Sequence, residues 1–386
     1  MDRDSTQLLT ETTGFDLVEQ AFRSSGAEAV FESLIQKARE DRNYRMIFSV
    51  RLMQVRYKLG LPLIDPDPVP KLTDAQRPAY DQACREAALE TGGLFLASGD
   101  IPSAWPYFRA LGEKTPVAAA IETVTAAQEN VDPVIEIAYK EGVNPRKGFE
   151  LLIEHRGICS AITWFGYNRD YDSRQECLKL LLETLYRQVA AALRESIGAV
   201  EGSVPEADRV ADLITGRPWL FEGNSSYTDS THLTSILRFT PELEDDATLR
   251  MAVELTDYGR QLNPMFHFRG DPPFEDTYLD HGIYLRALLG EDVNAAVAHF
   301  HAKAADSTDP VTSAEVLIDF LVRLRRFDEA IQASLEFFPD PSQASMNCPS
   351  VLQLCQMAGD HEKLRSVARD QGDVIGYAAG LIQSAN

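Results

Sequence analysis

Two short segments of the sequence place a histidine beside residues that could share its chemistry. In the first, EHRGICS, His155 and Cys159 are four residues apart. A helix would therefore put both side chains on one face, a spacing that metal ligands use. In the second, YTDSTH, Asp229 and His232 are three residues apart, where a loop enters the predicted helix THLTSILRF. Both pairs could bind a metal or move a proton.

A third histidine segment is the most acidic of the set. An acid-rich loop that contains Glu275 runs into a predicted helix, and Asp280 directly precedes His281. Histidine titrates near neutral pH, so it serves either as a metal ligand or as an acid–base group. If a curved helical stack turns the three segments toward one surface, a divalent metal or an acid–base site would use His155, His232 and His281, with Asp229 or Asp280.

A purely structural interpretation stays open beside this hypothesis. Asp229 and Asp280 are residue types that cap helix N-termini, and His232 and His281 would then be first-turn residues bonded to backbone or solvent. His155 would be a histidine packed between helices.

Aromatic and apolar residues near a proline-rich stretch suggest a place where a ligand could bind. The run MFHFR lies just before Asp271-Pro272-Pro273, outside any amphipathic stripe. Large aromatic residues also fill helical cores, which is the competing interpretation. The residues that we predict to line a ligand groove are Trp164, Met265, Phe266, His267 and Arg269.

The elements that must position these residues are helices. Leu178, Leu181, Leu182, Leu185, Val189 and Leu193 form one apolar stripe at helical spacing. The motif S-x-x-E at Ser173 predicts the start of this helix and a capping box. Strict alternation of apolar and polar residues is rare, so the sequence predicts an all-α fold.

Four segments share one design, in which a helix and a short turn precede a second helix with small and aromatic residues. They are residues 94–111, 284–304, 320–338 and 352–368. The run FDEAI at Phe327, followed by Phe337 and Pro339, resembles the turn and closing proline of tetratricopeptide-like repeats. This resemblance covers roughly the last 110 residues and one segment near Trp105. It implies stacked antiparallel helical hairpins, an α-solenoid, and a role in binding peptides or partner proteins. Residues 120–280 do not match the pattern and predict a less regular helical block.

The charge of the chain limits the kinds of partner that it can bind. The 386 residues carry a formal net charge of −22, whereas nucleic acids and anionic membranes attract basic surfaces. We therefore expect neither as a partner. The five cysteines have irregular spacing and the N-terminus lacks an apolar signal core, so we expect a cytoplasmic protein with reduced thiols.

Proline- and glycine-containing stretches suggest where the chain divides. We predict N-terminal helices in residues 1–60, a helical block in residues 72–195 and a second block with repeats in residues 219–386, or else one continuous superhelix. The predicted function is a scaffold that holds a peptide, protein or small ligand on its concave face. The alternative is a metal-dependent or His/Asp acid–base enzyme.

Overall fold

The computed structural model describes residues 4–64, 72–168, 173–340, 345 and 348–384, with side chains from residue 14 onward. These residues form eighteen α-helices and no strand, apart from one isolated bridge between Arg269 and Asp276. The predicted all-α fold is therefore confirmed. None of the described helices is both long enough and apolar enough to cross a membrane.

The chain divides into two compact units, residues 1–155 and residues 156–386. The division falls inside α7 (Pro145–Tyr167), where Gly157 has φ 80° and ψ 168° and interrupts the helix. A left-handed φ of this kind suits glycine because it has no Cβ. The helical spacing predicted for His155 and Cys159 is therefore wrong, since this interruption lies between them. Residues 65–71, which make up most of the proline-rich stretch between the predicted blocks 1–60 and 72–195, lie outside the described residues.

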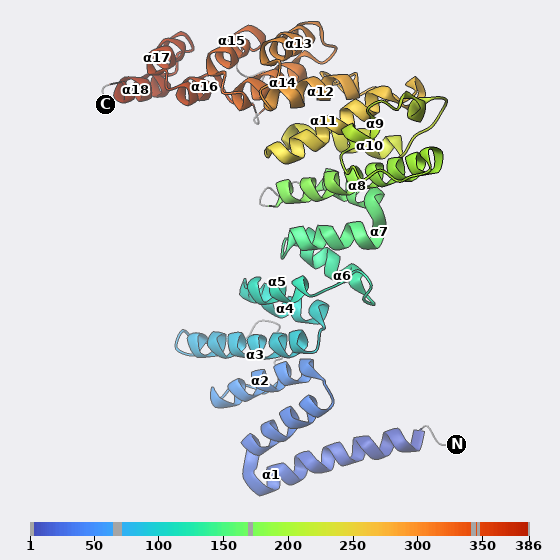
Figure 1. Cartoon of the computed structure of the whole chain (residues 1–386). Helices are drawn as coiled ribbons and strands as arrows, with labels where there is room; N and C mark the ends of the chain where they lie inside the picture. Colours follow the sequence, from blue (N-terminus) through green and yellow to red (C-terminus); the bar gives the residue numbers. More distant parts are fainter. Residues whose placement is uncertain (1–3, 65–71, 169–172, 341–344, 346–347, 385–386) are drawn as a thin grey trace. The chain divides into compact units, whose positions relative to one another are not determined.

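The first unit is a series of helices in which neighbours along the chain pack on one another, from α1 through α5 (Figure 1). Its members are α1 (Asp4–Glu40), α2 (Tyr44–Lys58), α3 (Arg77–Ala97), α4 (Ile101–Leu111), α5 (Thr115–Glu122), α6 (Val131–Ile135), the π-helical turn η1 (Glu136–Lys140) and the first part of α7.

The second unit begins with the rest of α7 and then α8 (Arg174–Glu201). All six residues of the predicted stripe on α8 are fully buried, which explains why this helix forms. Ser173 is the N-cap residue, as predicted, but its side chain makes no capping bond.

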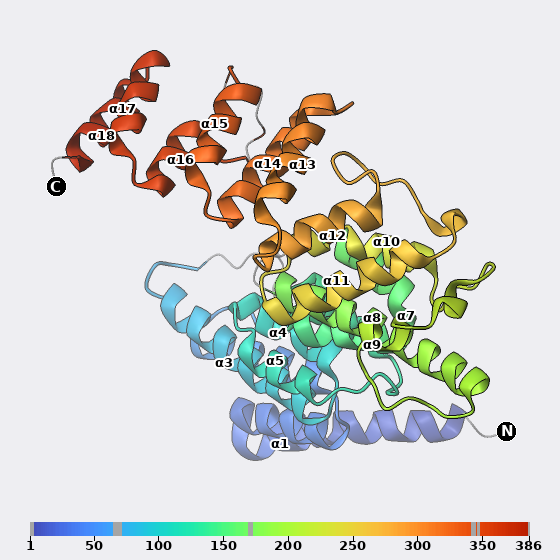
Figure 2. The same ribbon diagram turned by 45° about the horizontal axis from the view of Figure 1, so that its top comes forward.

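The remaining elements of the second unit follow in chain order (Figures 1 and 2). They are α9 (Val210–Ile214), η2 (Pro218–Phe221), α10 (Ser230–Leu237), η3 (Thr240–Glu242), α11 (Asp246–Gln261), η4 (Pro264–Phe266), α12 (Thr277–Leu288), α13 (Val293–Asp306), α14 (Pro310–Arg323), α15 (Phe327–Phe337), α16 (Val351–Ala358), α17 (His361–Asp370) and α18 (Val374–Gln383).

Helices α11 to α18 pack each against the next, and one apolar core runs through α12 to α17. Each of the four segments with the shared design forms two consecutive helices: α3 and α4, α12 and α13, α14 and α15, and α16 and α17. Aromatic rings join successive layers of the core. The ring centroids of Tyr284 and Phe320 lie 4.4 Å apart, and those of Phe300 and Phe320 lie 5.3 Å apart. Because neighbouring hairpins share this core, no pair of helices buries its apolar faces alone.

The contact between α11 and α12 depends on a glycine. A Cβ atom at Gly259 would lie 2.3 Å from Cδ1 of the fully buried Tyr278. We expect Gly259→Ala to lower the free energy of unfolding by about 1–3 kcal/mol, because Tyr278 has to move within a packed core. Urea unfolding measures the change. Gly166→Ala is the control, since a Cβ there meets only an ordinary contact at 3.7 Å. Equal stability of the two variants would contradict this view of the helix contact.

Candidate functional site

His155 and His232 each lie near one carboxylate of their own neighbourhood. His155 Nε2 is 3.4 Å from Asp132 Oδ1, and His232 Nε2 is 3.9 Å from Asp229 Oδ2. Asp229 is the N-cap of α10, where its Oδ1 accepts a bond of 2.8 Å from the backbone N–H of Thr231. Asp229 thus has the capping role of the structural interpretation.

His281 is buried in the first turns of α12. Its Nδ1 donates a hydrogen bond of 2.7 Å to the Thr277 carbonyl, and its ring stacks on Phe274 with centroids 4.3 Å apart. Burial lowers the pKa of His281 to about 4, because the charged imidazolium would lose its hydration. His281 is therefore neutral at physiological pH. Across the described residues, no three His, Cys, Asp or Glu side chains gather in a way that could hold a metal ion.

Asp280 is the centre of a buried polar network. Its side chain is 1% exposed, and its Oδ1 lies 2.8 Å from His299 Nε2 on α13. Its Oδ2 accepts bonds from Lys303 Nζ at 2.8 Å and from the Asp276 backbone N–H at 2.9 Å. The carboxylate therefore joins α12 to α13. The cap of α12 is Asp276, which accepts a bond from the Leu279 N–H, so the capping role proposed for Asp280 is wrong.

Lys303 extends this network to the loop before α12. Its Nζ also donates to Glu275 Oε2 at 2.5 Å. Although burial alone would disfavour the ammonium, the bonds to Asp280 and Glu275 raise the pKa of Lys303. Burial likewise opposes the charged form of Glu275, but Lys303 holds the pKa of that carboxyl below its usual value. Both groups are charged, and the ion pair anchors the end of the loop.

The 262–276 loop, which joins α11 to α12, is held by several bonds to the start of α12. The hydroxyl of Tyr278 donates to the Phe266 carbonyl at 3.1 Å, and that of Thr277 donates to the Phe268 carbonyl at 3.0 Å. Within the loop, the Gly270 N–H donates to the Glu275 carbonyl at 3.0 Å. A Cβ at Gly270 would lie 2.2 Å from the Phe274 carbonyl oxygen, so the turn requires glycine.

This well-anchored loop nevertheless presents apolar side chains to solvent. Met265 is 59% exposed and Phe268 is 40% exposed. A pocket of about 320 Å³ lies between the loop and α12, lined by His267, Phe268, Arg269, Glu275, Asp276, Thr277 and Tyr278. The side chain of Arg269 makes no hydrogen bond or ion pair within the described part of the chain, although its charge lies near Glu275.

The predicted groove residues are distributed over two places. His267 and Arg269 line the pocket, Met265 is exposed on the same loop, and Phe266 is half-buried there. Trp164 lies on α7 instead, where the Arg156 guanidinium sits 5.1 Å from its ring centroid.

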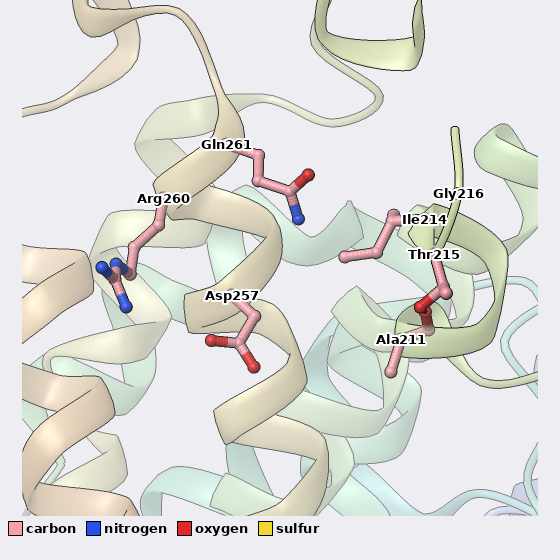
Figure 3. A pocket seen from close by; sticks show the side chains of 7 residues that line it. All are labelled: Ala211, Ile214, Thr215, Gly216, Asp257, Arg260 and Gln261. Atoms are coloured by element: carbon pink, nitrogen blue, oxygen red, sulfur yellow. The ribbon is translucent and has the colours of Figure 1, made fainter. Parts of the chain in front are cut away.

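A second pocket, of about 520 Å³, lies between α9 and α11 (Figure 3). In Figure 3, Ile214 of α9 and Gln261 of α11 point toward each other across it, while Arg260 points away from α9. Asp257, also in its wall, accepts two bonds of 2.6 Å from Arg286 of α12. Its charge is thus already balanced by the chain itself.

The short helix α9 beside this pocket is fixed by the buried carboxylate of Glu254. That carboxylate accepts a bond of 2.5 Å from the Tyr186 hydroxyl, bonds from Arg209, and one of 3.1 Å from the Ala211 N–H. Burial opposes ionisation, but these donors lower the pKa of Glu254. The network is therefore a structural tie between α8, α9 and α11.

Sequence reasoning overlooked the partners of Asp280. His299 and Lys303 are four residues apart, so a helix places them on one face. This spacing was a usable signal, but nothing in it indicates which carboxylate that face meets. Tyr278, which also lines the pocket, was missed, whereas Phe268 belongs to the run MFHFR that the sequence singles out.

Comparisons with protein-family models, with curated protein sequences and with solved structures found no match to this chain.

Proposed function

We propose that this chain is a cytoplasmic, tetratricopeptide-like helical-repeat binding protein that holds a short peptide segment of a partner protein. The binding site is the pocket between the 262–276 loop and α12. The observation that carries the proposal is a rigidly held loop with exposed apolar side chains and an unengaged arginine.

The 262–276 loop is held in place before any partner binds. Long loops in compact helical proteins are commonly functional. In this loop the carbonyls of Phe266 and Phe268 accept bonds from side chains of α12, and the carboxylate of Glu275 accepts one from Lys303 of α13. A loop that is ordered before binding loses less conformational entropy when a partner arrives.

The chemistry of the exposed groups suggests which side chains the bound peptide carries. Aromatic residues, methionine and arginine are enriched at protein interfaces, and Met265, Phe268 and Arg269 supply all three. The acids of the pocket are already engaged, because Glu275 pairs with Lys303 and Asp276 caps α12. The site therefore favours a peptide with a large apolar side chain for the pocket and a carboxylate for Arg269.

An array of immobilised decapeptides that vary one apolar and one acidic position tests this proposal. We expect the wild-type chain to bind a subset of peptides that contain both features. Arg269→Glu should weaken that binding at least about tenfold, because it replaces attraction with repulsion. Phe268→Ala should weaken it as well, since it removes an exposed aromatic anchor.

The matched control is Arg250→Glu, which makes the same charge change at an exposed position of α11. This variant should bind as the wild type does. Binding that survives Arg269→Glu, or an array on which no peptide is retained, would contradict the proposal.

The acid–base alternative has one supporting observation, the pair of His299 with the buried Asp280. That carboxylate is shared with Lys303, and His299 is not among the residues that line the adjacent pocket. A structural tie between α12 and α13 accounts for the same contacts, so binding is the better-supported function.

A further inference from the structure

The 262–276 loop contains a short extended segment with an inner edge that is paired and an outer edge that is not. Arg269 forms an antiparallel bridge with Asp276. Residues of an antiparallel ladder alternate between opposite pairs that exchange both backbone bonds and opposite pairs that exchange none. The neighbouring Gly270 N–H donates to the Glu275 carbonyl at 3.0 Å, so Arg269 and Asp276 are a pair of the second kind. The N–H and C=O of Arg269 therefore point away from Asp276.

The outer edge of this segment has no partner in the described part of the chain. No hydrogen bond forms there to the N–H or C=O of Arg269 or to the C=O of His267, whose backbone is also extended, with φ −91° and ψ 96°. Buried backbone groups are almost always paired, and both residues are exposed, so these groups face solvent. Unpaired N–H and C=O groups on an extended edge are a template for another strand.

The charges at this edge favour a peptide over a second copy of the chain. If two copies paired antiparallel around this residue, two Arg269 side chains would lie opposite each other, and like charges in that position are destabilising. The formal net charge of −22 also repels a second copy. A peptide with a carboxylate is attracted to Arg269 instead. Its apolar side chain can enter the adjoining pocket of about 320 Å³, which Arg269 and His267 help to line.

We infer that the bound peptide adds to this edge as a β-strand. Its N–H groups donate to the carbonyls of His267 and Arg269, and one of its carbonyls accepts from the Arg269 N–H. The inference rests on the proposed peptide-binding function and adds the conformation of the ligand to it. In strand addition, main-chain bonds supply affinity and side-chain pockets supply specificity. The ligand class is thus an extended segment with no proline at the residues that pair, since proline cannot donate.

A scan of N-methylated peptides tests the inference. The probe is the array decapeptide that the wild-type chain binds most tightly, methylated at one backbone nitrogen at a time, with affinity measured by fluorescence anisotropy. Methylation removes one donor, so it should weaken binding at least about tenfold at each peptide residue that donates to the edge. The residues between them point their N–H groups to solvent and should tolerate methylation. The losses should therefore recur at every second residue.

The amide of Arg269 gives a second measurement, made on the protein by nuclear magnetic resonance. In the free chain the Arg269 amide should exchange with solvent quickly, whereas the bonded Gly270 amide should exchange slowly. The unmethylated peptide at saturation should slow exchange of the Arg269 amide at least about tenfold, because it supplies an acceptor. The Gly270 amide is the internal control and should change little.

The outcomes separate this inference from the proposed function. A peptide that binds but tolerates methylation at every position, or loses affinity evenly along its central residues as a helical peptide would, overturns strand addition and leaves peptide binding intact. Binding that leaves the Arg269 amide unprotected has the same meaning. An array on which no peptide is retained overturns both.

Discussion

Replacing Asp280 by alanine is expected to lower the free energy of unfolding by about 3 kcal/mol. The carboxylate is 1% exposed and binds His299, Lys303 and the Asp276 N–H. Its removal leaves His299 and the Asp276 N–H without this acceptor and leaves Lys303 with Glu275 alone, in a site that water reaches poorly. It also removes the polar tie between α12 and α13. Urea unfolding at pH 7 measures the loss.

Two further variants make this expectation specific. Asp280→Asn keeps the shape and one acceptor oxygen and should be less damaging than alanine. Asp276→Ala removes only the cap of α12 and should cost about 1 kcal/mol. If Asp280→Ala is no more destabilising than Asp276→Ala, the buried network does not hold these helices together.

Acid should destabilise the protein through His281. Its folded pKa is about 4, below the ordinary value of 6.5, so the unfolded chain binds the proton more readily. Stability is therefore fully present above pH 6.5 and is lost as the pH falls from 6.5 toward 4. A shift of about 2.5 pKa units corresponds to about 3 kcal/mol over this range.

A variant without a titrating group at position 281 separates the contribution of His281 to the pH dependence of stability from that of the carboxylates. Glutamine at position 281 can still donate to the Thr277 carbonyl but carries no titrating group. The difference in unfolding free energy between pH 7 and pH 4, measured in urea, should be about 3 kcal/mol smaller for His281→Gln than for wild type. Equal pH dependence of the two proteins would show that His281 is not buried in its neutral form.

Much of the fold could be predicted from periodicity alone. The leucine stripe of α8 is fully buried, because a helix whose apolar residues recur on one face must cover that face. The four segments of two helices joined by a short turn also form as expected. Their turn residues and small residues act within each segment, so the sequence of the segment is enough to predict them. The capping box at Ser173 did not form: its N-cap position was correct, but its side chain makes no capping bond.

The site was harder to predict, because its contacts join residues distant in sequence. Asp280 and His281 were correctly marked as unusual, yet Asp280 meets His299 and Lys303 of the next helix. Local spacing cannot reveal such a pairing between helices. The backbone at Gly157 could not be predicted from local spacing either. Its left-handed conformation interrupts a segment that otherwise has helical spacing.

The central proposal is that the 262–276 loop and the start of α12 hold a peptide. Hydrogen–deuterium exchange of the full chain, with and without the tightest peptide from the array, tests it most directly. We predict that the peptide slows exchange in residues 262–279 and that Arg269→Glu abolishes this protection at the same peptide concentration. Protection confined to other helices, or equal protection in Arg269→Glu, would contradict the proposal.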